Sequence, residues 1–169
     1  MAVTLDRREM LAALASLVAA GAARADAAVR LEWEDLLPEG ARASATANAL
    51  RGVPDRAPSD VATRQPQSTG VRTDWNGRTV ALDGFVVPLE HSGDGVTAFI
   101  LVPYVGACVH VPPPPANQLV FVTTGCPWQS DGLFEPVTVT GTFGTAPTST
   151  QLAEIGYALS ADRIQPFSG

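Results

Sequence analysis

The chain places two reactive side chains, Cys108 and His110, two positions apart, just before a run of four prolines. It has two cysteines and two histidines in its 169 residues, so this pairing uses one of each. On an extended backbone, residues two positions apart point to the same face, where a thiolate and an imidazole could bind one ion. This ligand pair favours zinc or copper over magnesium or calcium. The spacing suggests one transition-metal ion, with zinc expected before copper.

A metal site needs more than two ligands, and neighbouring predicted strands offer candidates. Glu90 is the expected third ligand, because it ends the strand that precedes the motif strand. His91 and Cys126 are possible additional ligands. We expect the fourth coordination position of the ion to be open. This arrangement suits an ion that is transferred to another protein, because a closed four-ligand site releases metal slowly.

The residues that follow His110 are expected to form a rigid rim. Proline has no N–H group and a fixed φ, so the run should form a short polyproline II segment: Pro112, Pro113, Pro114 and Pro115. Asn117 and Gln118 come next, and their amides could orient the imidazole or a bound water through hydrogen bonds. They could equally cap the start of a strand.

The same residues allow other interpretations. Cys108 could be a buried small hydrophobic residue, and His110 could cap the end of a strand. Cys108 and Cys126 could also form one disulfide in an oxidising compartment. Because a disulfide would use up the only motif thiolate, we predict that Cys108 is a free thiol. A third hypothesis makes Cys108 and His110 a nucleophile and its base, although the sequence shows no orienting third residue and no oxyanion hole.

The first 27 residues have the composition of a cleaved export signal. Arg7 and Arg8 precede an apolar, alanine-rich stretch from Met10 to about Ala23, and small residues offer cleavage sites beyond it. The apolar stretch is too short to span a bilayer. The paired arginines resemble a twin-arginine signal, with the Sec route as the alternative. We therefore expect a periplasmic protein that keeps no integral membrane segment after cleavage.

Composition narrows the class of partner. The net charge of −6 and the pI of about 4.7 argue against nucleic acid, because no basic stripe is present to neutralise phosphates. With 46 % apolar and 17 % charged residues, the chain reads as globular.

The pattern beyond the signal predicts a mainly β protein. An N-terminal extension and linker is expected at 28–70, with Trp33 plugging one end of the core, and a barrel domain at 71–169. Alternating apolar residues predict strands at 78–90, 96–105, 117–125 and 135–144, and 162–167 could be a closing strand. Gly84 should mark a bend or bulge in the first strand, and Thr148–Leu159 reads as a short C-terminal helix. Five short strands and one helix suggest a small barrel of the oligonucleotide/oligosaccharide-binding (OB) type, with a β-sandwich as the fallback.

Four segments, "WEDLLP", "LDGFVVPLE", "FILVPYVGACVHVPPPPANQLVFV" and "PVTVTGTF", resemble the DUF3299 family of exported bacterial proteins. The resemblance covers Leu31–Pro38 and Asp74–Phe167. Its motif positions here are Glu90, Cys108, His110, Asn117 and Gln118, whereas His91 and Cys126 lie outside the motif. The resemblance implies a periplasmic accessory or metal-handling role, linked to a membrane transporter of the ABC type.

Three functions follow from the residues and the resemblance together. Metal binding or handling, accessory to an ABC-type transporter, ranks first. A non-catalytic periplasmic adaptor or interaction protein with no metal site ranks second, and a Cys-His thiol enzyme third.

Overall fold

The protein is built from strands throughout most of the part that the computed structural model describes, residues 27–41, 65–108 and 113–167. The strands are β1 (Val29–Leu31), β2 (Thr79–Ser92), β3 (Gly95–Val102), β4 (Val120–Trp128), β5 (Pro136–Ser149) and β6 (Glu154–Pro166). Two short 3-10 helices accompany them, η1 (Trp33–Leu36) and η2 (Ala116–Gln118). Within these ranges, no helix is long and apolar enough to cross a membrane.

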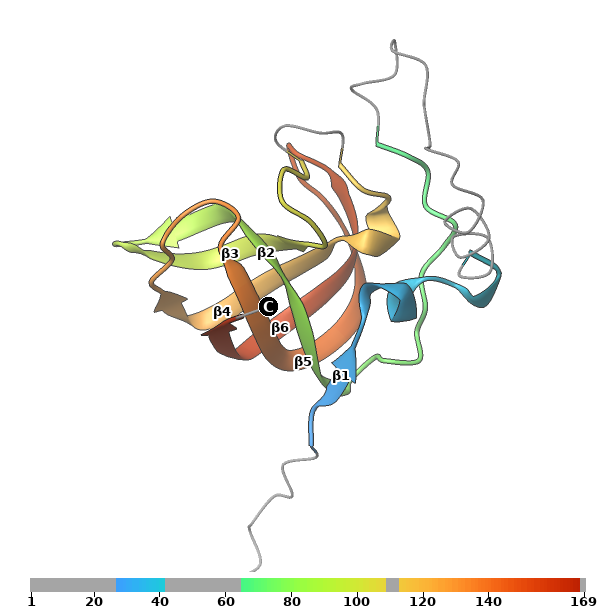
Figure 1. Cartoon of the computed structure of the whole chain (residues 1–169), viewed down its shortest axis with the longest axis horizontal. Coiled ribbons are helices and arrows are strands. Elements are labelled where there is room, and N and C mark those ends of the chain that lie inside the picture. The colour runs from blue at the N-terminus through green and yellow to red at the C-terminus, as the bar shows by residue number, and fades with distance from the viewer. Residues whose placement is uncertain (1–26, 42–64, 109–112, 168–169) are drawn as a thin grey trace, which may run out of the picture.

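Five of the strands close into a barrel (Figure 1). The order is β2-β3-β4-β6-β5, and β5 pairs with β2 to complete the circle. Neighbouring barrel strands are antiparallel except β4 and β6, which are parallel. This order, with its single parallel contact, is the topology of an OB barrel. The mainly β, OB-like five-stranded barrel predicted from the sequence is confirmed.

Gly84 allows β2 to pair with two different strands along its length. The first half of β2 pairs with β5 from Thr79 to Phe85, and the second half pairs with β3 from Phe85 to Ser92. Gly84 lies where the partners change. A Cβ there would come within 2.8 Å of Leu101 Cγ and 2.9 Å of the Val102 carbonyl oxygen. The close approach of β3 therefore requires glycine, and the bend predicted at this residue lies where the barrel turns.

The C-terminal helix predicted over Thr148–Leu159 is wrong. The Thr150 hydroxyl accepts the backbone N–H of Ala153 at 3.0 Å, as a helix cap would, but here it closes the turn between β5 and β6. From Glu154 the chain is a strand, in which Ile155, Tyr157 and Leu159 are all buried. A two-residue apolar period in this segment outweighs the capping signal.

The barrel encloses an inner core of alternating apolar side chains. The members are Leu31, Leu36, Val80, Leu82, Val86, Val96, Phe99, Leu101, Val120, Val122, Val137, Val139, Phe143, Tyr157 and Leu159. Each barrel strand contributes, so the core ties together strands that are far apart in the sequence. The Phe143 and Tyr157 rings lie 5.1 Å apart, centre to centre, at a tilt of 34°.

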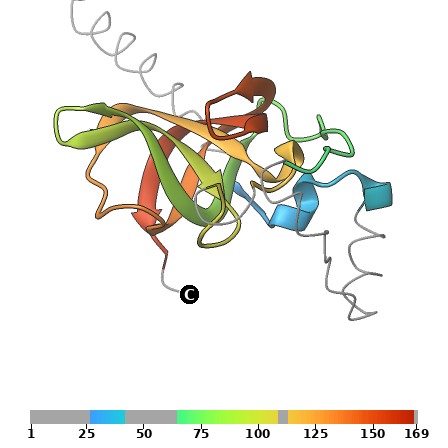
Figure 2. The same ribbon diagram turned by 90° about the horizontal axis from the view of Figure 1, so that it is seen from above.

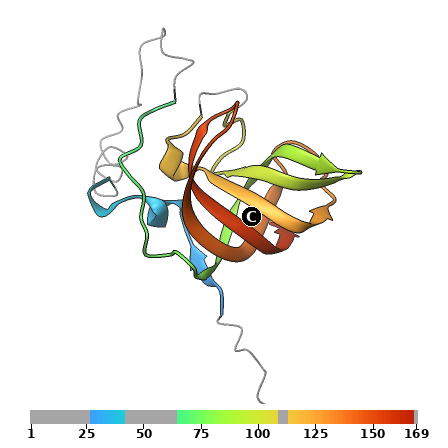
Figure 3. The ribbon, with the colours of Figure 1, turned by 180° about the vertical axis from the view of Figure 1, so that it is seen from behind.

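The N-terminal segment covers one side of this barrel (Figures 2 and 3). Strand β1, which the sequence analysis missed, pairs in parallel with the start of β2. Trp33 packs against the inner core, as its predicted role as a plug requires, and its Nε1 donates to the Asp83 carbonyl oxygen at 2.8 Å. Leu36 is fully buried in the same core. The loop at 129–135, between the third and fourth barrel strands, contains no helix.

The Tyr157 hydroxyl joins the N-terminal segments to the barrel. It donates to the Leu36 carbonyl oxygen at 2.6 Å and accepts the Arg72 backbone N–H at 2.7 Å. Leu36 and Arg72 belong to two segments that lie side by side along the barrel (Figures 1 and 3). One side chain of β6 thus holds both segments.

We predict that Tyr157→Phe lowers the free energy of unfolding by about 1–3 kcal/mol, because two backbone groups lose their shared partner. Urea denaturation of the mature protein would measure the loss. Tyr104→Phe is the matched control, since Tyr104 is exposed, and it should change stability by less than about 0.5 kcal/mol. Equal effects of the two substitutions would show that the hydroxyl does not fasten the segment.

Candidate functional site

A second group of apolar side chains packs apart from the inner core. This outer cluster consists of the buried residues Val87, Ile100, Val102, Ala107, Leu119, Ala153 and Ile155, with Phe85, Leu89, Cys108, Phe121 and Phe134 partly buried against them. In β2, Phe85, Val87 and Leu89 alternate with the inward-facing residues of the barrel, so this cluster lies on the outer face of the sheet. Loops before η2, before β5 and before β6 complete it. Cys108 therefore lies in an apolar environment.

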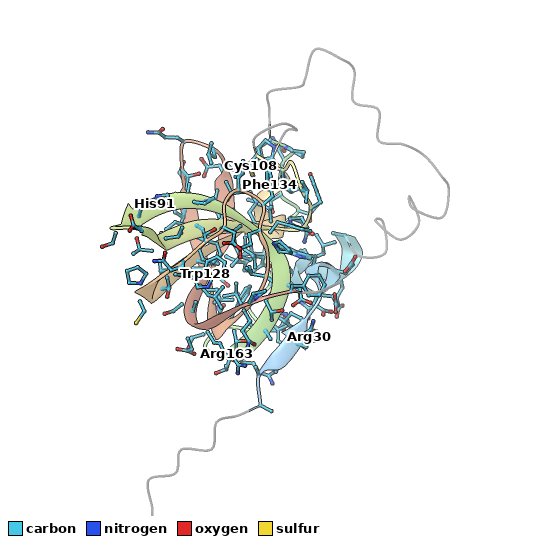
Figure 4. The ribbon with its side chains drawn as sticks, turned by 60° about the vertical axis from the view of Figure 1, so that its left-hand side comes forward. Arg30, His91, Cys108, Trp128, Phe134 and Arg163 are labelled. Carbon is cyan, nitrogen blue, oxygen red and sulfur yellow. The ribbon has the colours of Figure 1, made fainter. Side chains whose placement is uncertain are left out.

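The Cys108 backbone is in a conformation that residues with a side chain seldom adopt. Its φ is +68°, and Phe134, in the same outer cluster, has a φ of +61°. Left-handed non-glycine residues cost energy and gather at functional sites. Figure 4 shows both residues at the same end of the barrel. Two such residues in one cluster single out this end as a candidate site.

Burial controls the chemistry of the Cys108 thiol. The half-buried position raises the pKa of Cys108 to about 11, because the apolar surroundings disfavour the thiolate. Burial and the nearby Cys108 also raise the pKa of Tyr104. At neutral pH the group is a thiol, which is a poor nucleophile and must lose a proton before it can bind a metal.

The partner residue His110 lies outside the described residues, as does Pro112. The predicted Cys108–His110 pair therefore stays a prediction. Among the described residues, no three His, Cys, Asp or Glu side chains gather closely enough to hold a metal ion.

The predicted third ligand, Glu90, lies toward the other end of β2. It pairs with Ala98, whereas the chain leaves β3 for the Cys108 loop at Val102. Ala98 and Val102 are four residues apart in β3, which is about 13 Å along the strand. Glu90 is exposed and lines a groove that is described below. The described donors therefore do not form a zinc or copper site by themselves.

His91 and Cys126 lie toward the β2–β3 turn, away from the end of β3 where the chain enters the Cys108 loop. His91 is exposed beside the β2–β3 turn. Cys126 is exposed six residues beyond Val120 in β4, a separation of about 20 Å along the strand. Both cysteines are free. That Cys108 is a free thiol in the functional, exported protein stays a prediction.

The motif amides hold the N-terminal segments in the structure. The Asn117 Nδ2 group donates to Gly70 O at 2.8 Å and to Thr69 Oγ1 at 3.1 Å. The Gln118 Nε2 group donates to Trp33 O at 2.9 Å. Asn117 is buried, and its Oδ1 atom has no hydrogen-bond partner in the described part of the chain. In the described part of the chain, these amides thus bind the segments that cover the barrel. Their role in orienting His110 stays a prediction.

The prolines are also joined to the rest of the fold. Pro114 is buried, and its carbonyl oxygen accepts a hydrogen bond from Gln65 Nε2 at 2.8 Å. Pro115 has φ −54° and ψ 151°, close to polyproline II values. Gly156 is packed so tightly against this segment that a Cβ would lie 2.8 Å from the Ala116 carbonyl oxygen. Pro114 and Ala116 are thus tied to neighbouring segments. That the four prolines form a rigid rim stays a prediction.

A groove runs between β2 and the β5–β6 turn. Its volume is about 570 Å³, within the usual range of ligand sites. It is lined by Pro88, Leu89, Glu90, Phe121, Thr148, Ser149, Thr150, Gln151 and Leu152. Of these residues, only Glu90 was predicted from the sequence as a site residue. Apolar residues at alternate, outward-facing strand positions, such as Leu89 and Phe121, could have indicated the groove.

Exposed apolar side chains border the outer cluster. We call Tyr104, Val105, Leu133 and Leu152 the apolar rim; they are 45 %, 60 %, 49 % and 39 % exposed. Tyr104 and Val105 precede Cys108 in its loop, whereas Leu133 adjoins Phe134 and Leu152 adjoins Ala153. In the described part of the chain, Val71 is the one other large apolar residue with similar exposure. Apolar exposure is thus concentrated in the three loops that build the cluster.

Comparison with known proteins connects this arrangement to one family. Residues 33–166 match the model of a family described as protein of unknown function (DUF3299). The crystal structure of a DUF3299 family protein from Pseudomonas aeruginosa PAO1 is similar, with 34 % identity and a TM-score of 0.68. The similarity covers 85 % of this chain and 98 % of that one. No curated protein matches the chain.

We predict that the Cys108 thiol reacts slowly with iodoacetamide. In Cys126→Ser, Cys108 should be alkylated at least about tenfold more slowly at pH 8 than Cys126 is in Cys108→Ser, since a pKa of about 11 leaves about one thiolate in a thousand. The Cys108 rate should still rise at pH 9.5. A rate that levels off below pH 9 would contradict the raised pKa. In urea the two thiols should react alike.

Proposed function

The chain belongs to the DUF3299 family, whose function is unknown, and we propose that it is a non-catalytic binding protein that holds a segment of a partner protein. The observation that carries the proposal is the apolar rim. Monomeric proteins expose scattered apolar residues, but a gathered set marks an interaction surface. Tyr104, Val105, Leu133 and Leu152 lie in the loops that build the outer cluster.

The chemistry around Cys108 favours binding over catalysis. A nucleophilic cysteine needs an environment that lowers the thiol pKa, such as a nearby cation or a helix N-terminus. Cys108 has apolar neighbours instead, and its pKa is raised. Its thiol suits a packing role at the centre of an interaction surface.

Metal handling by Cys108 and His110 is the second candidate function. Cys108 favours it, because its thiol is free and its strained backbone lies at a motif position. The raised pKa opposes it. Moving a thiol from its ordinary 9.0 to about 11 weakens metal binding at neutral pH by about a hundredfold, since the proton must be displaced. We therefore rank it below partner binding.

Export would place the apolar rim outside the cytoplasm. The signal-like first 27 residues support a periplasmic location, which we keep as part of the proposal. A subunit of an ABC-type transporter is then a candidate partner. The acidic net charge of −6 makes a nucleic-acid partner unfavourable.

We predict that a photo-crosslinking amino acid at Val105 gives a discrete adduct with one partner in the native host. The same amino acid at Gln165, an exposed residue near the far end of β6, should give none. Adding Leu133→Asp to the Val105 probe should abolish the adduct, because a buried carboxylate in an apolar interface is costly. Circular dichroism would confirm that each variant keeps its fold.

Two results would refute the proposal. One is an equal adduct from Val105 and Gln165, which would reflect random collision. The other is an adduct that survives Leu133→Asp unchanged, since the apolar rim would then not be the contact.

We predict that titration calorimetry of the mature protein with zinc, and separately with Cu(I), gives weak binding that Cys108→Ser and His110→Ala leave within about threefold. This follows because the described donors form no site and the thiol holds its proton. Tight binding that both substitutions abolish would make metal handling the first candidate function in place of partner binding.

A further inference from the structure

The groove beside the apolar rim carries negative charge without a compensating cation. Glu90 lines it, and Glu154 lies at its margin, where its Oε1 accepts the Ser149 hydroxyl at 2.6 Å. In the described part of the chain, neither carboxylate has an ion pair with a basic side chain. The groove is therefore an acidic site.

The described basic side chains are engaged elsewhere. The chain has no lysine, so all 11 basic residues are arginines. Arg30 pairs with Asp83, Arg72 pairs with Asp74, and Arg78 stacks over Trp75 at 5.5 Å. Figure 4 shows Arg30 and Arg163 at the opposite end of the barrel from Cys108. Among the described residues, no arginine is paired with the groove carboxylates, so the groove would attract a cation.

Most polar atoms in the groove wall already have partners. The hydroxyls of Thr148, Ser149 and Thr150 donate to Ala146 O, Glu154 Oε1 and Ala153 O, respectively. The side chains of Glu90 and Gln151 have no hydrogen bond with another described residue. A ligand would therefore find one carboxylate and one amide free to bind it, which limits recognition to a few polar contacts.

The remaining lining of the groove is apolar. Leu89 and Phe121 belong to the outer cluster, and Leu152 belongs to the apolar rim. An occupant must therefore bury apolar side chains and present a positive charge. A polyamine lacks the apolar side chains, and the phosphates of an oligonucleotide would face Glu90 and Glu154.

We propose that the groove binds an extended, basic segment of the partner, in which an arginine or lysine side chain pairs with Glu90. Apolar side chains of the segment pack on Phe121 and Leu152, and Gln151 hydrogen-bonds to its backbone. The inference rests on the proposed binding function and specifies the chemistry of its ligand. The volume of about 570 Å³ suits a short stretch of peptide rather than a whole domain.

The test is fluorescence anisotropy with a labelled, end-blocked hexapeptide of alternating leucine and arginine. The matched ligand carries citrulline, a neutral isostere, in place of arginine. The mature protein should bind the arginine peptide more tightly, and rising salt should remove the difference. Glu90→Gln should weaken binding of the arginine peptide by about threefold to tenfold and leave the citrulline peptide unaffected.

Asp94→Asn is the control variant, because it removes one exposed carboxylate outside the groove. It should leave affinity for both peptides unchanged. Leu152→Ser should weaken both peptides alike, because it removes apolar contact and no charge.

Equal effects of Glu90→Gln and Asp94→Asn would overturn the inference, since attraction would then come from net charge alone. So would equal affinity for the arginine and citrulline peptides, or preference for an acidic peptide or an oligonucleotide. These results concern the groove, whereas crosslinking from Val105 tests the apolar rim. The proposed binding function can therefore stand when this inference fails.

Discussion

The hydrogen bonds of the Tyr157 hydroxyl hold the structure together at the side of the barrel that the N-terminal segment covers. In this chain no helix lies in the loop between the third and fourth barrel strands, and Leu36 and Trp33 supply the apolar cover. Because Tyr157 lies in β6, the cover is joined to the strand that makes the only parallel contact of the barrel.

The DUF3299 motif contributes to this same closure. Asn117 and Gln118 donate to backbone oxygens of the segments that cover the barrel, and Gly156 lets their 3-10 helix approach β6. These residues therefore stabilise the fold whatever the protein binds. Cys108 is different: it packs on the outer cluster with a left-handed backbone, and its thiol has no hydrogen bond with another described residue. The motif thus combines residues that hold the barrel with one residue that faces the candidate site.

Function follows from the contrast between the two faces of the sheet. The inner face is sealed, whereas the outer face of β2, β3 and β4 is only partly covered by loops. Those loops bear the apolar rim, and the groove beside them has a free carboxylate at Glu90. Arg30 and Arg163 lie at the end of the barrel away from Cys108. The groove joins an exposed apolar side chain of the rim, Leu152, to the Glu90 carboxylate. A surface of this kind favours a partner segment over a small reactive substrate.

The sequence by itself determined the barrel. Alternation of apolar residues located four of the five barrel strands, because burial on a sheet follows a local period of two. The bend at Gly84 and the packing of Trp33 on the core were also predicted correctly, whereas only the end of β6, at 162–167, was predicted as a strand. The helix prediction at Thr148–Leu159 was wrong because one local pattern fits two structures. The Thr150 hydroxyl accepts a backbone N–H in a turn, as it would at the start of a helix. Only the tertiary structure decided what surrounds Cys108, how far Glu90 lies from it, and which atoms Asn117 and Gln118 contact. These contacts and distances depend on strand register and on segments that are distant in the sequence. Neither can be predicted from a pattern of neighbouring residues.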